Sequence, residues 1–388
     1  MSLSPGAVIL QVTPALDTGG VEHTTLDVAA AIVAAGGRAL VASAGGRLEG
    51  ELRARGGELI RLPVDRKHPV TLWRNAARLT ELIRRERVGL VHVRSRAPAF
   101  SALAAARRTG VPSVATYHGL YNARSGLKRW YNAVMTRSDL VIANSDFTRA
   151  HILAEHGTDP ARVVSIPRGV DLARFDPAAV SSERVAAVRA SWGLAPDDRR
   201  TVFLLAGRLT RWKGQGLLIE AAARSAAAGQ GGFVLVLAGD DQGRSDYRAE
   251  LERQAVAAGL ADQVRLPGHC SDMPAAYLAA DFACAPSLEP EAFGRTAVEP
   301  QAMGRPVLAA AHGGATETVA DGETGRLIAP GDVNAWAKGL GWALALSPER
   351  RAAMGAAGRE RTRRLYSLEA MTGATLDLYA RLLGGRRP

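Results

Sequence analysis

The chain has few of the features that mark several large classes of protein. Only two of its 388 residues are cysteine, Cys270 and Cys284, which excludes a disulfide framework and a cysteine-based metal site. No apolar run reaches the ~18 residues that a membrane-spanning helix needs. The first residues lack the basic start of a signal peptide. We therefore expect a cytoplasmic protein whose contact with a membrane, if it has one, is peripheral at the inner face.

Signatures of several ligand-binding loops are missing as well. Gly214-Gln215-Gly216 is followed by Leu217, so the third glycine of a dinucleotide-binding loop is absent. The chain has no G-x-x-x-x-G-K-[ST] phosphate loop and no Asp-x-Asp pair, a common clamp for a divalent metal ion. No nucleic-acid motif occurs, and aromatic residues are not interleaved with the basic pairs. We therefore expect neither a metal ion, nor a cofactor, nor a nucleic-acid partner.

Positive charge is concentrated in the first half of the chain. Residues 1–170 contain 23 lysines and arginines against 13 aspartates and glutamates, whereas residues 171–388 contain 26 against 25. The basic pairs of the first half include Arg66-Lys67, Arg84-Arg85, Arg107-Arg108 and Lys128-Arg129. A basic face favours an anionic partner, such as a lipid surface or a phosphorylated acceptor. The alternative is a compositional excess of arginine on ordinary solvated faces.

Apolar runs alternate regularly with helical patterns along the chain. The runs predict strands at 7–12, 39–42, 58–62, 90–93, 113–116, 140–143 and 163–166, and again at 201–206, 233–238, 264–266, 282–285, 307–310 and 326–328. Helical patterns lie between them, for example at 22–35, 71–85, 100–108 and 127–137. Such alternation predicts parallel sheets covered on both faces. Because 388 residues are too many for one ordinary core, we expect two doubly wound α/β domains.

The alternation is interrupted between Pro167 and Pro177, where proline, glycine and aspartate gather. We place the domain boundary there, with residues 1–170 in the first domain and 171–367 in the second. After Pro348 the pattern is helical to about Leu383, with amphipathic spacing in its last part.

Two glutamates, Glu291 and Glu299, flank the start of a predicted helix. Glu291 lies in a loop after a buried strand, and Glu299 is expected about two turns into the helix. Free backbone N–H groups at a helix start can hold an anion, and a carboxylate on each side can accept hydrogen bonds from hydroxyl groups. This arrangement suits a phosphate flanked by polyols, which is what a nucleotide sugar presents. Two solvated surface glutamates are the alternative.

Three further groups follow predicted strands, where ligands bind in open parallel sheets. Gly19 and Gly20 precede the first helix, where a substrate can approach the backbone closely. His118 follows the fifth predicted strand, and Arg208 and Lys213 follow the eighth. Two cations at a strand end can bracket a diphosphate. Each group also has a structural interpretation: a plain turn, a hydrogen-bonded histidine, or a solvated basic turn.

The chain resembles the retaining glycosyltransferases of glycosyltransferase family four, which have the GT-B fold. The matching motifs are Ala206-Gly207-Arg208-Leu209 with Lys213-Gly214, Leu266-Pro267-Gly268-His269 through Met273-Pro274 and Tyr277, the spaced glutamates, Gly322-Glu323-Thr324-Gly325-Arg326-Leu327, and the linker from Pro167 to Phe175. The resemblance extends over nearly the whole chain but is specific mainly after residue 200.

This resemblance implies two Rossmann-like domains that face each other across a cleft. The last helix, about 368–388, would pack back on the first domain. The second domain would bind a nucleotide sugar, and the first would bind the acceptor. Catalytic roles are implied for His118 beside the transferred sugar, for Arg208 and Lys213 on the leaving diphosphate, and for Glu291 on the sugar hydroxyls. The donor-binding residues would be Gly19, Gly20, Phe293, Gly294, Thr296 and Glu299, the last of these on the ribose.

The function expected from these features is glycosyl transfer from a nucleotide sugar to a glycan or lipid-linked acceptor. By resemblance the anomeric configuration is retained, no metal is needed, and the pathway is cell-envelope polysaccharide or lipopolysaccharide synthesis. Two alternatives stay open: another sugar-nucleotide enzyme of the same fold, such as an epimerase, and a two-domain sugar-binding protein without catalysis. The sequence does not name the sugar, the base or the acceptor.

Overall fold

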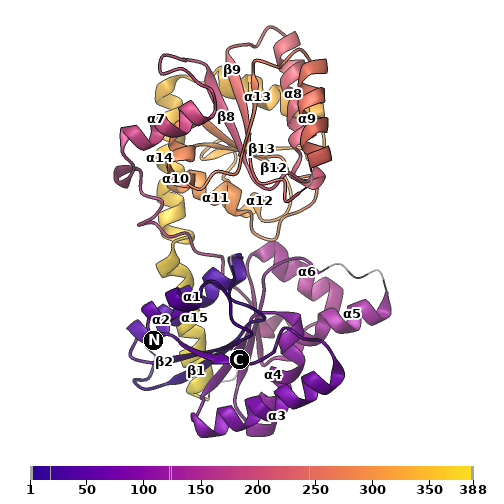
Figure 1. Cartoon of the computed structure of the whole chain (residues 1–388), viewed down its shortest axis with the longest axis vertical. Helices are drawn as coiled ribbons and strands as arrows, with labels where there is room; N and C mark the ends of the chain where they lie inside the picture. Colours follow the sequence, from indigo (N-terminus) through magenta and orange to yellow (C-terminus); the bar gives the residue numbers. More distant parts are fainter. Residues whose placement is uncertain (1–2, 18, 122, 124, 244, 386–388) are drawn as a thin grey trace. The chain divides into compact units, whose positions relative to one another are not determined.

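The computed structural model describes residues 3–17, 19–121, 123, 125–243 and 245–385. It divides into an N-terminal unit, Met1–Gly169 with Leu368–Pro388, and a C-terminal unit, Val170–Ser367 (Figure 1). Each unit contains one parallel sheet with helices on both faces. This confirms the predicted α/β class with two doubly wound domains. Residues 386–388 of the expected last helix lie outside the described residues.

The N-terminal unit is built on a seven-stranded sheet with the order β3-β2-β1-β4-β5-β6-β7. Its strands are β1 (Val8–Val12), β2 (Arg38–Ser43), β3 (Glu58–Arg61), β4 (Leu90–Val93), β5 (Ser113–Tyr117), β6 (Leu140–Ala143) and β7 (Val163–Ser165). Its helices are α1 (Gly20–Ala34), α2 (Glu49–Ala54), α3 (Pro69–Arg85), α4 (Arg96–Thr109), α5 (Gly126–Asn132), α6 (Asp146–His156) and α15 (Leu368–Leu383), with short 3-10 turns η1 (Ala133–Arg137) and η2 (Pro160–Arg162).

Side-chain alternation along the strands forms two separate cores in this unit. In β4, Leu90 packs into the core that contains residues of α1 and α15. Val91 and Val93, on the opposite face, pack into the core that contains residues of α3 and α4. Because successive side chains of a strand point to opposite faces, one strand contributes to both layers.

The ends of the helices follow local sequence signals. The side chain of Ser145 accepts a hydrogen bond from the Thr148 backbone and so caps the start of α6. α4 and α6 end at Gly110 and Gly157, which both have the left-handed conformation that glycine adopts at low cost. The predicted helix at 127–137 is instead α5 followed by the 3-10 turn η1.

A buried histidine attaches α15 to the sheet of the N-terminal unit. His92 of β4 is fully buried. Its Nδ1 atom is hydrogen-bonded to the Tyr379 hydroxyl of α15, and its Nε2 atom lies 2.7 Å from the Thr116 hydroxyl of β5. Burial raises the pKa of Tyr379 to about 12, so the phenol stays protonated and can donate. The last helix of the chain is therefore held by a polar contact as well as by apolar packing.

The C-terminal unit has a six-stranded sheet with the order β10-β9-β8-β11-β12-β13. Its strands are β8 (Thr201–Ala206), β9 (Phe233–Ala238), β10 (Val264–Gly268), β11 (Phe282–Ala285), β12 (Val307–Ala310) and β13 (Gly325–Ile328). Its helices are α7 (Ser182–Ser191), α8 (Gln215–Ala227), α9 (Ser245–Ala257), α10 (Met273–Ala279), α11 (Arg295–Ala302), α12 (Ala315–Thr318), α13 (Val333–Leu344) and α14 (Pro348–Leu365), with 3-10 turns η3 (Pro177–Ala179) and η4 (Arg211–Lys213).

The same alternation organises the C-terminal sheet. Phe203 and Leu205 of β8 pack into the core with residues of α8, α9 and α13. Val202 and Leu204 pack into the opposite core, with residues of α7, α10 and α11. The sheet is therefore covered by helices on both faces, and loops lie at the ends of its strands.

The chain passes twice between the units, and the two crossings pair inside the C-terminal unit. The Val170 backbone N–H donates to the Tyr366 carbonyl at 2.7 Å, and Val170 forms an isolated β-bridge with Ser367. The pattern that predicts helix from Pro348 to about Leu383 is therefore two helices, α14 and α15. They are separated at Tyr366–Ser367, where the chain leaves the C-terminal unit.

The Tyr379→Phe variant tests the attachment of α15. It should lower the free energy of unfolding by about 1–3 kcal/mol, because it leaves His92 Nδ1 buried without its partner. Chemical denaturation measures the change. Tyr131→Phe, at a partly exposed tyrosine, is the control and should be close to neutral. Equal stability of the Tyr379→Phe and wild-type proteins would show that apolar packing alone holds the helix.

Candidate functional site in two parts

The strand orders place a switch point in each sheet. In the C-terminal unit β8 and β11 are neighbours, and successive strands are added to one side of β8 and then to the other side, beginning with β11. In the N-terminal unit the corresponding neighbours are β1 and β4. Ligands of open parallel sheets bind beyond the carboxyl ends of the strands at such points. A ligand site is therefore expected at the loops that follow these four strands.

An ion pair joins the two loops at the switch point of the C-terminal unit. Lys213 follows β8, Glu291 follows β11, and Lys213 Nζ lies 2.8 Å from Glu291 Oε1. The exposed fractions of the two side chains are only 12% and 19%. The Ser287 hydroxyl donates to the same oxygen at 2.5 Å. The Lys213 ammonium also lies over the Trp212 ring, with its Nζ atom 4.5 Å from the ring centroid.

Two glycines allow these loops to approach each other closely. Gly214 has φ +81°, and a Cβ atom there would lie 2.2 Å from the Pro286 carbonyl oxygen. Gly313 has φ +61°, and a Cβ atom there would lie 2.6 Å from the Glu291 carbonyl oxygen. A larger residue at Gly214 would push away the backbone of Pro286, and one at Gly313 would push away the backbone of Glu291. The close approach therefore fixes the position of the Lys213–Glu291 pair.

Glu299 lies on α11 with both carboxylate oxygens engaged. Arg295 Nε donates to Oε1 at 2.8 Å, and the Tyr277 hydroxyl donates to Oε2 at 3.2 Å. Burial raises the pKa of Tyr277 well above its usual range, and the adjacent Glu299 carboxylate adds to the effect. α11 begins at Arg295, so Glu299 lies just over one turn into the helix, and the expected depth of two turns is wrong. Gly294 in the left-handed conformation, φ +82°, delays the helix start.

The loop between the glutamates presents backbone rather than apolar side chains. Phe293 is buried, with its ring packed edge-on against Tyr366 at 5.7 Å between centroids. This contact anchors the loop in the core. A small recess beside it is lined by Ser287, Glu291, Gly294, Thr296 and His312, among others. Predicted donor contacts at Phe293, Gly294 and Thr296 therefore depend on main-chain atoms and on the Thr296 hydroxyl.

Arg208 lies on the loop after β8 and is exposed. Its carbonyl accepts a hydrogen bond from Gln215 Nε2 at 2.9 Å, which fixes the backbone at this position. Within the described residues its guanidinium has no hydrogen bond or ion pair. The side chain is thus free to meet a ligand, in contrast to Lys213, which already has a partner.

The N-terminal unit contributes His118, directly after β5. Arg168 Nη2 lies 3.1 Å from His118 Nδ1 and donates to the His118 carbonyl at 3.3 Å. Burial lowers the pKa of His118 well below its usual range, and the guanidinium groups of Arg168 and Arg94 lower it further. The imidazole is therefore neutral near pH 7. Because Arg168 can only donate, Nδ1 must accept and Nε2 must carry the proton.

His118 Nε2 is buried and has no hydrogen-bond partner among the described residues. A buried N–H without a partner is costly, so this donor is suited to a ligand oxygen. The same edge of the sheet holds Arg94, which follows β4 and bonds the amide oxygen of Gln11 at 3.0 Å through Nε. The buried groups around His118 are thus cationic or neutral.

In the glycine loop after β1 only Thr18 lies outside the described residues. Gly19 caps α1, which starts at Gly20. The Glu22 carboxylate folds back, so that a Cβ atom on Gly19 would lie 2.2 Å from Glu22 Oε2. A ligand at this helix start would have to displace that flexible side chain. The role predicted for Gly19 and Gly20 stays a prediction.

The predicted site residues thus fall into two groups. Arg208, Lys213, Glu291, Phe293, Gly294, Thr296 and Glu299 belong to the C-terminal unit, and Gly19, Gly20 and His118 belong to the N-terminal unit. Sequence reasoning missed Ser287, Arg295 and Arg168, which orient Glu291, Glu299 and His118. The spacing of Arg295 and Glu299, four residues apart on a helix, was a usable signal. Nothing in the sequence indicated the other two.

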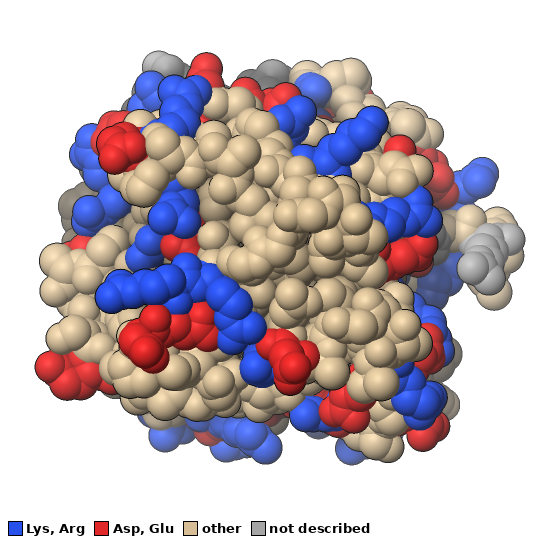
Figure 2. Space-filling view, turned by 90° about the horizontal axis from the view of Figure 1, so that it is seen from above, with Lys and Arg blue, Asp and Glu red and all other residues tan. Residues whose placement is uncertain are grey.

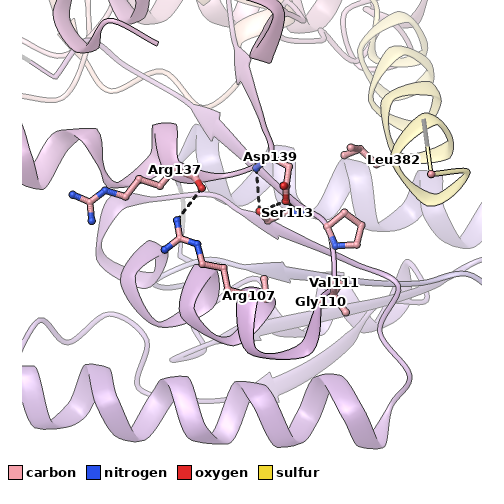
Figure 3. A pocket seen from close by; sticks show the side chains of 10 residues that line it. Arg107, Gly110, Val111, Ser113, Arg137, Asp139 and Leu382 are labelled. Atoms are coloured by element: carbon pink, nitrogen blue, oxygen red, sulfur yellow. Dashed lines mark hydrogen bonds between the residues drawn. The ribbon is translucent and has the colours of Figure 1, made fainter. Parts of the chain in front are cut away.

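A cavity of about 910 Å³ opens elsewhere in the N-terminal unit (Figure 3). Its lining includes Arg107, Ser113, Arg137 and Asp139. Ser113 is the first residue of β5 and Asp139 immediately precedes β6, so the cavity lies at the amino ends of the strands. Because parallel sheets bind substrates at the opposite edge, we do not assign this cavity to the donor or the acceptor.

The described residues contain no group of three or more histidine, cysteine, aspartate or glutamate side chains that could hold a metal ion. No helix in the described part of the chain has both the length and the apolarity to cross a membrane.

Two family models match the chain. Residues 18–174 match the model described as Glycosyltransferase Family 4, and residues 189–361 match Glycosyl transferases group 1. The D-inositol 3-phosphate glycosyltransferase of Salinispora tropica is 34% identical over 301 residues, which are 73% of this chain and 62% of that protein. The protein of the same name from Mycobacterium tuberculosis is 34% identical over 254 residues, 65% of this chain and 50% of that one. The chain thus spans about half to three fifths of these relatives.

Solved structures agree over nearly the full length. A glycosyltransferase from Rickettsia africae has a TM-score of 0.89 and 31% identity, with 97% of this chain and 98% of that chain covered. HepE from Anabaena, in complex with UDP and glucose, has a TM-score of 0.81 and 24% identity, with 96% and 99% covered. The second likeness shows the fold alone. The chain belongs to the family 4 glycosyltransferases of GT-B fold.

The two buried histidines predict how stability depends on pH. Burial lowers the pKa of His92 and of His118 well below the usual 6.5. Below that pH the unfolded chain binds protons that the folded chain does not, so the free energy of unfolding should fall as the pH falls. Two such groups give a slope of up to ~3 kcal/mol per pH unit. Denaturant titrations between pH 7 and pH 5 measure it.

The His118→Asn variant is the control for this slope. It removes one of the two fully buried imidazoles and leaves His92 and the partly buried His156, whose pKa burial also lowers, so its stability should fall less steeply than that of the wild type over the same range. A wild-type free energy of unfolding that is constant from pH 7 to pH 5 would contradict the assignment of both imidazoles as neutral.

Proposed function

We propose that the protein transfers a glycosyl group from a nucleotide sugar to a glycan or lipid-linked acceptor. In this proposal the anomeric configuration is retained and no metal ion takes part. The observation that carries it is the Lys213–Glu291 pair at the switch point of the C-terminal sheet. Membership of a glycosyltransferase family supports the reaction class, and the UDP and glucose bound by HepE support a nucleotide-sugar donor.

Donor binding would exchange the partners of the ion pair. The diphosphate would take the Lys213 ammonium, with the exposed Arg208 guanidinium on its other side. Glu291, released from Lys213 but still bonded to the Ser287 hydroxyl, would accept hydrogen bonds from sugar hydroxyls. The pair thus keeps a cation and an anion in place before the donor arrives. Preorganised groups of this kind need no rearrangement as charge develops.

The chemical step proposed from the family resemblance takes place on one face of the sugar. The acceptor oxygen forms a bond to the anomeric carbon from the side on which the bond to the diphosphate breaks. The acceptor proton passes to a phosphate oxygen of the leaving group. Lys213 and Arg208 would neutralise the charge that develops there, which is the task that a metal ion performs in other enzymes. The neutral His118 would donate its Nε2–H to a sugar oxygen.

The acceptor class is the least constrained part of the proposal. The basic N-terminal unit suits a phosphorylated or membrane-bound acceptor. The relatives named D-inositol 3-phosphate glycosyltransferase support a soluble phosphorylated polyol. A lipid-linked glycan in envelope synthesis, at the inner face of the membrane, is the other candidate. We take the lipid-linked glycan as the proposed acceptor and the soluble phosphorylated polyol as the alternative.

A screen of nucleotide sugars against thermal unfolding tests the donor class. A true donor at 100 times its Kd should stabilise the protein by about 2.7 kcal/mol and raise Tm. The Glu299→Ala variant should lose ~1–3 kcal/mol of donor affinity, because a charge-assisted hydrogen bond to ribose is removed. Calorimetry compares the two proteins. A protein that no nucleotide sugar stabilises would be a sugar-binding protein or an enzyme of another class.

The Lys213→Met variant tests catalysis without a metal. It keeps the length of the side chain and removes the charge, so kcat should fall on the order of a hundredfold while the protein stays folded. Arg211→Ala is the matched control, since Arg211 is a neighbouring cation that pairs with Glu250 outside the site. Excess chelator should leave the wild-type rate unchanged. Normal turnover by Lys213→Met, or a requirement for magnesium or manganese, would refute the mechanism.

A further inference from the structure

The solvent-facing stripe of α3 combines an aromatic start with many cations. Its exposed side chains recur at helical spacing and are Val70, Trp73, Arg74, Ala77, Arg78, Glu81, Arg84 and Arg85. Trp73 is 67% exposed and Val70 49%. The opposite face of α3 buries Leu79, Leu82 and Ile83 in the core. The core face therefore accounts for the folding of α3, and it leaves the exposed Trp73 without a structural purpose.

α5 adds two more exposed apolar side chains next to the start of α3. Leu127 is 78% exposed and Trp130 51%. The Trp130 ring lies 5.5 Å from the Phe100 ring of α4, and Lys67, just before α3, has its ammonium 5.9 Å from the Tyr131 ring centroid of α5. Among the described residues, four of the seven exposed large apolar side chains lie on α3 and α5. These side chains are therefore clustered and not scattered.

Cations without carboxylate partners lie on the same helices and on the segments beside them. Within the described part of the chain no ion pair is formed by Lys67, Arg74, Arg78, Arg84, Arg107, Arg108, Lys128 or Arg137. Only Arg85 and Arg129 have one, with Glu86 and Glu155. The face of the molecule drawn in Figure 2 differs, since lysine and arginine lie there beside aspartate and glutamate. We use the name α3–α5 surface for a set of exposed residues on α3, α4, α5 and η1, together with Lys67. It consists of the exposed stripe of α3, Leu127 and Trp130 of α5, and the cations Lys67, Arg107, Arg108, Lys128, Arg129 and Arg137.

Two contacts make the surface continuous from α5 to the end of α4. Arg137 lies 5.1 Å from the Trp130 ring centroid, and Arg107 donates to the Arg137 carbonyl at 3.1 Å (Figure 3). Arg108 then lines a groove with Arg84 between α4 and α3. The cavity of Figure 3 opens beside Arg107 and Arg137. Cations therefore extend from the Trp130 ring to the C-terminal end of α4.

We propose that the α3–α5 surface docks the N-terminal unit onto an anionic phospholipid membrane. Tryptophan settles at the level of the lipid headgroups, where its ring is apolar and its N–H is wet. Lysine and arginine are attracted to anionic headgroups. Peripheral anchoring is stable when an apolar and a basic contribution act together, and this surface offers both. A nucleic acid would satisfy the cations but offers no apolar phase to Leu127 and Val70.

This inference rests on the proposed function, which places the acceptor in a membrane. An enzyme that uses a lipid-linked acceptor must reach the membrane, and the described residues contain no helix that could span it. The α3–α5 surface would hold the acceptor-binding unit at the bilayer, and the partner is a lipid surface with net negative charge.

Vesicle co-sedimentation of the full-length protein tests the proposal. The protein should sediment with vesicles of phosphatidylcholine and phosphatidylglycerol but not with phosphatidylcholine alone, and added salt should weaken binding. Trp73→Ser with Trp130→Ser, and separately Arg84→Glu with Arg108→Glu, should each weaken binding by roughly tenfold or more. The matched control is Arg253→Glu with Val256→Ser on α9, an exposed pair in the C-terminal unit. It should bind like the wild type.

Three outcomes would overturn the proposal. One is equal binding to neutral and anionic vesicles, and another is unchanged binding of the two surface variants. The third is a dimer in solution that the tryptophan variant dissociates, which would assign the surface to a second copy of the chain. Donor binding is measured in parallel by the nucleotide-sugar screen against thermal unfolding. Vesicle binding without stabilisation by any nucleotide sugar would contradict the proposed function alone, and donor binding without vesicle binding would contradict the docking surface alone.

Discussion

The convergence of parallel strand ends at one edge of each sheet is the constraint on which the site depends. Lys213 and Glu291 are separated by 78 residues but meet at 2.8 Å, because β8 and β11 are neighbours that run in the same direction. Neither side chain has a local reason to point at the other. The glycines at 214 and 313 then remove the last obstacle, which is steric. The strand order brings the two loops together, and the two glycines allow them to approach closely.

The two units use opposite electrostatic arrangements at these edges. In the C-terminal unit a cation and an anion neutralise each other in partial burial, so the edge is polar but balanced. In the N-terminal unit Arg94 and Arg168 lie near the neutral His118, and among the described residues no carboxylate is bonded to His118 or Arg94. A positive, partly desolvated edge favours a ligand with negative or electron-rich oxygens.

Sequence patterns were sufficient for the strands, because a buried strand needs an apolar run and most predicted runs agree with the structure to within two residues. They were also sufficient to select Lys213 and Glu291 as candidates, by resemblance. They could not show that Ser287 and Arg168 orient Glu291 and His118, since those contacts exist only after folding. The depth of Glu299 was wrong because the left-handed Gly294 shortens α11 at its start. Local conformation and distant contacts are what a linear pattern lacks.

The position of α15 has a consequence for how the chain is made. The N-terminal unit buries Leu378 and Tyr379 of this helix against residues of α1, β1 and β4. On the ribosome those partners emerge long before residues 368–383, with the entire C-terminal unit synthesised in between. The apolar face that α15 covers therefore lacks this helix until residues 368–383 have left the ribosome. Because the chain is synthesised from its N-terminus, the N-terminal unit begins to form first but is completed only after the C-terminal unit has been synthesised.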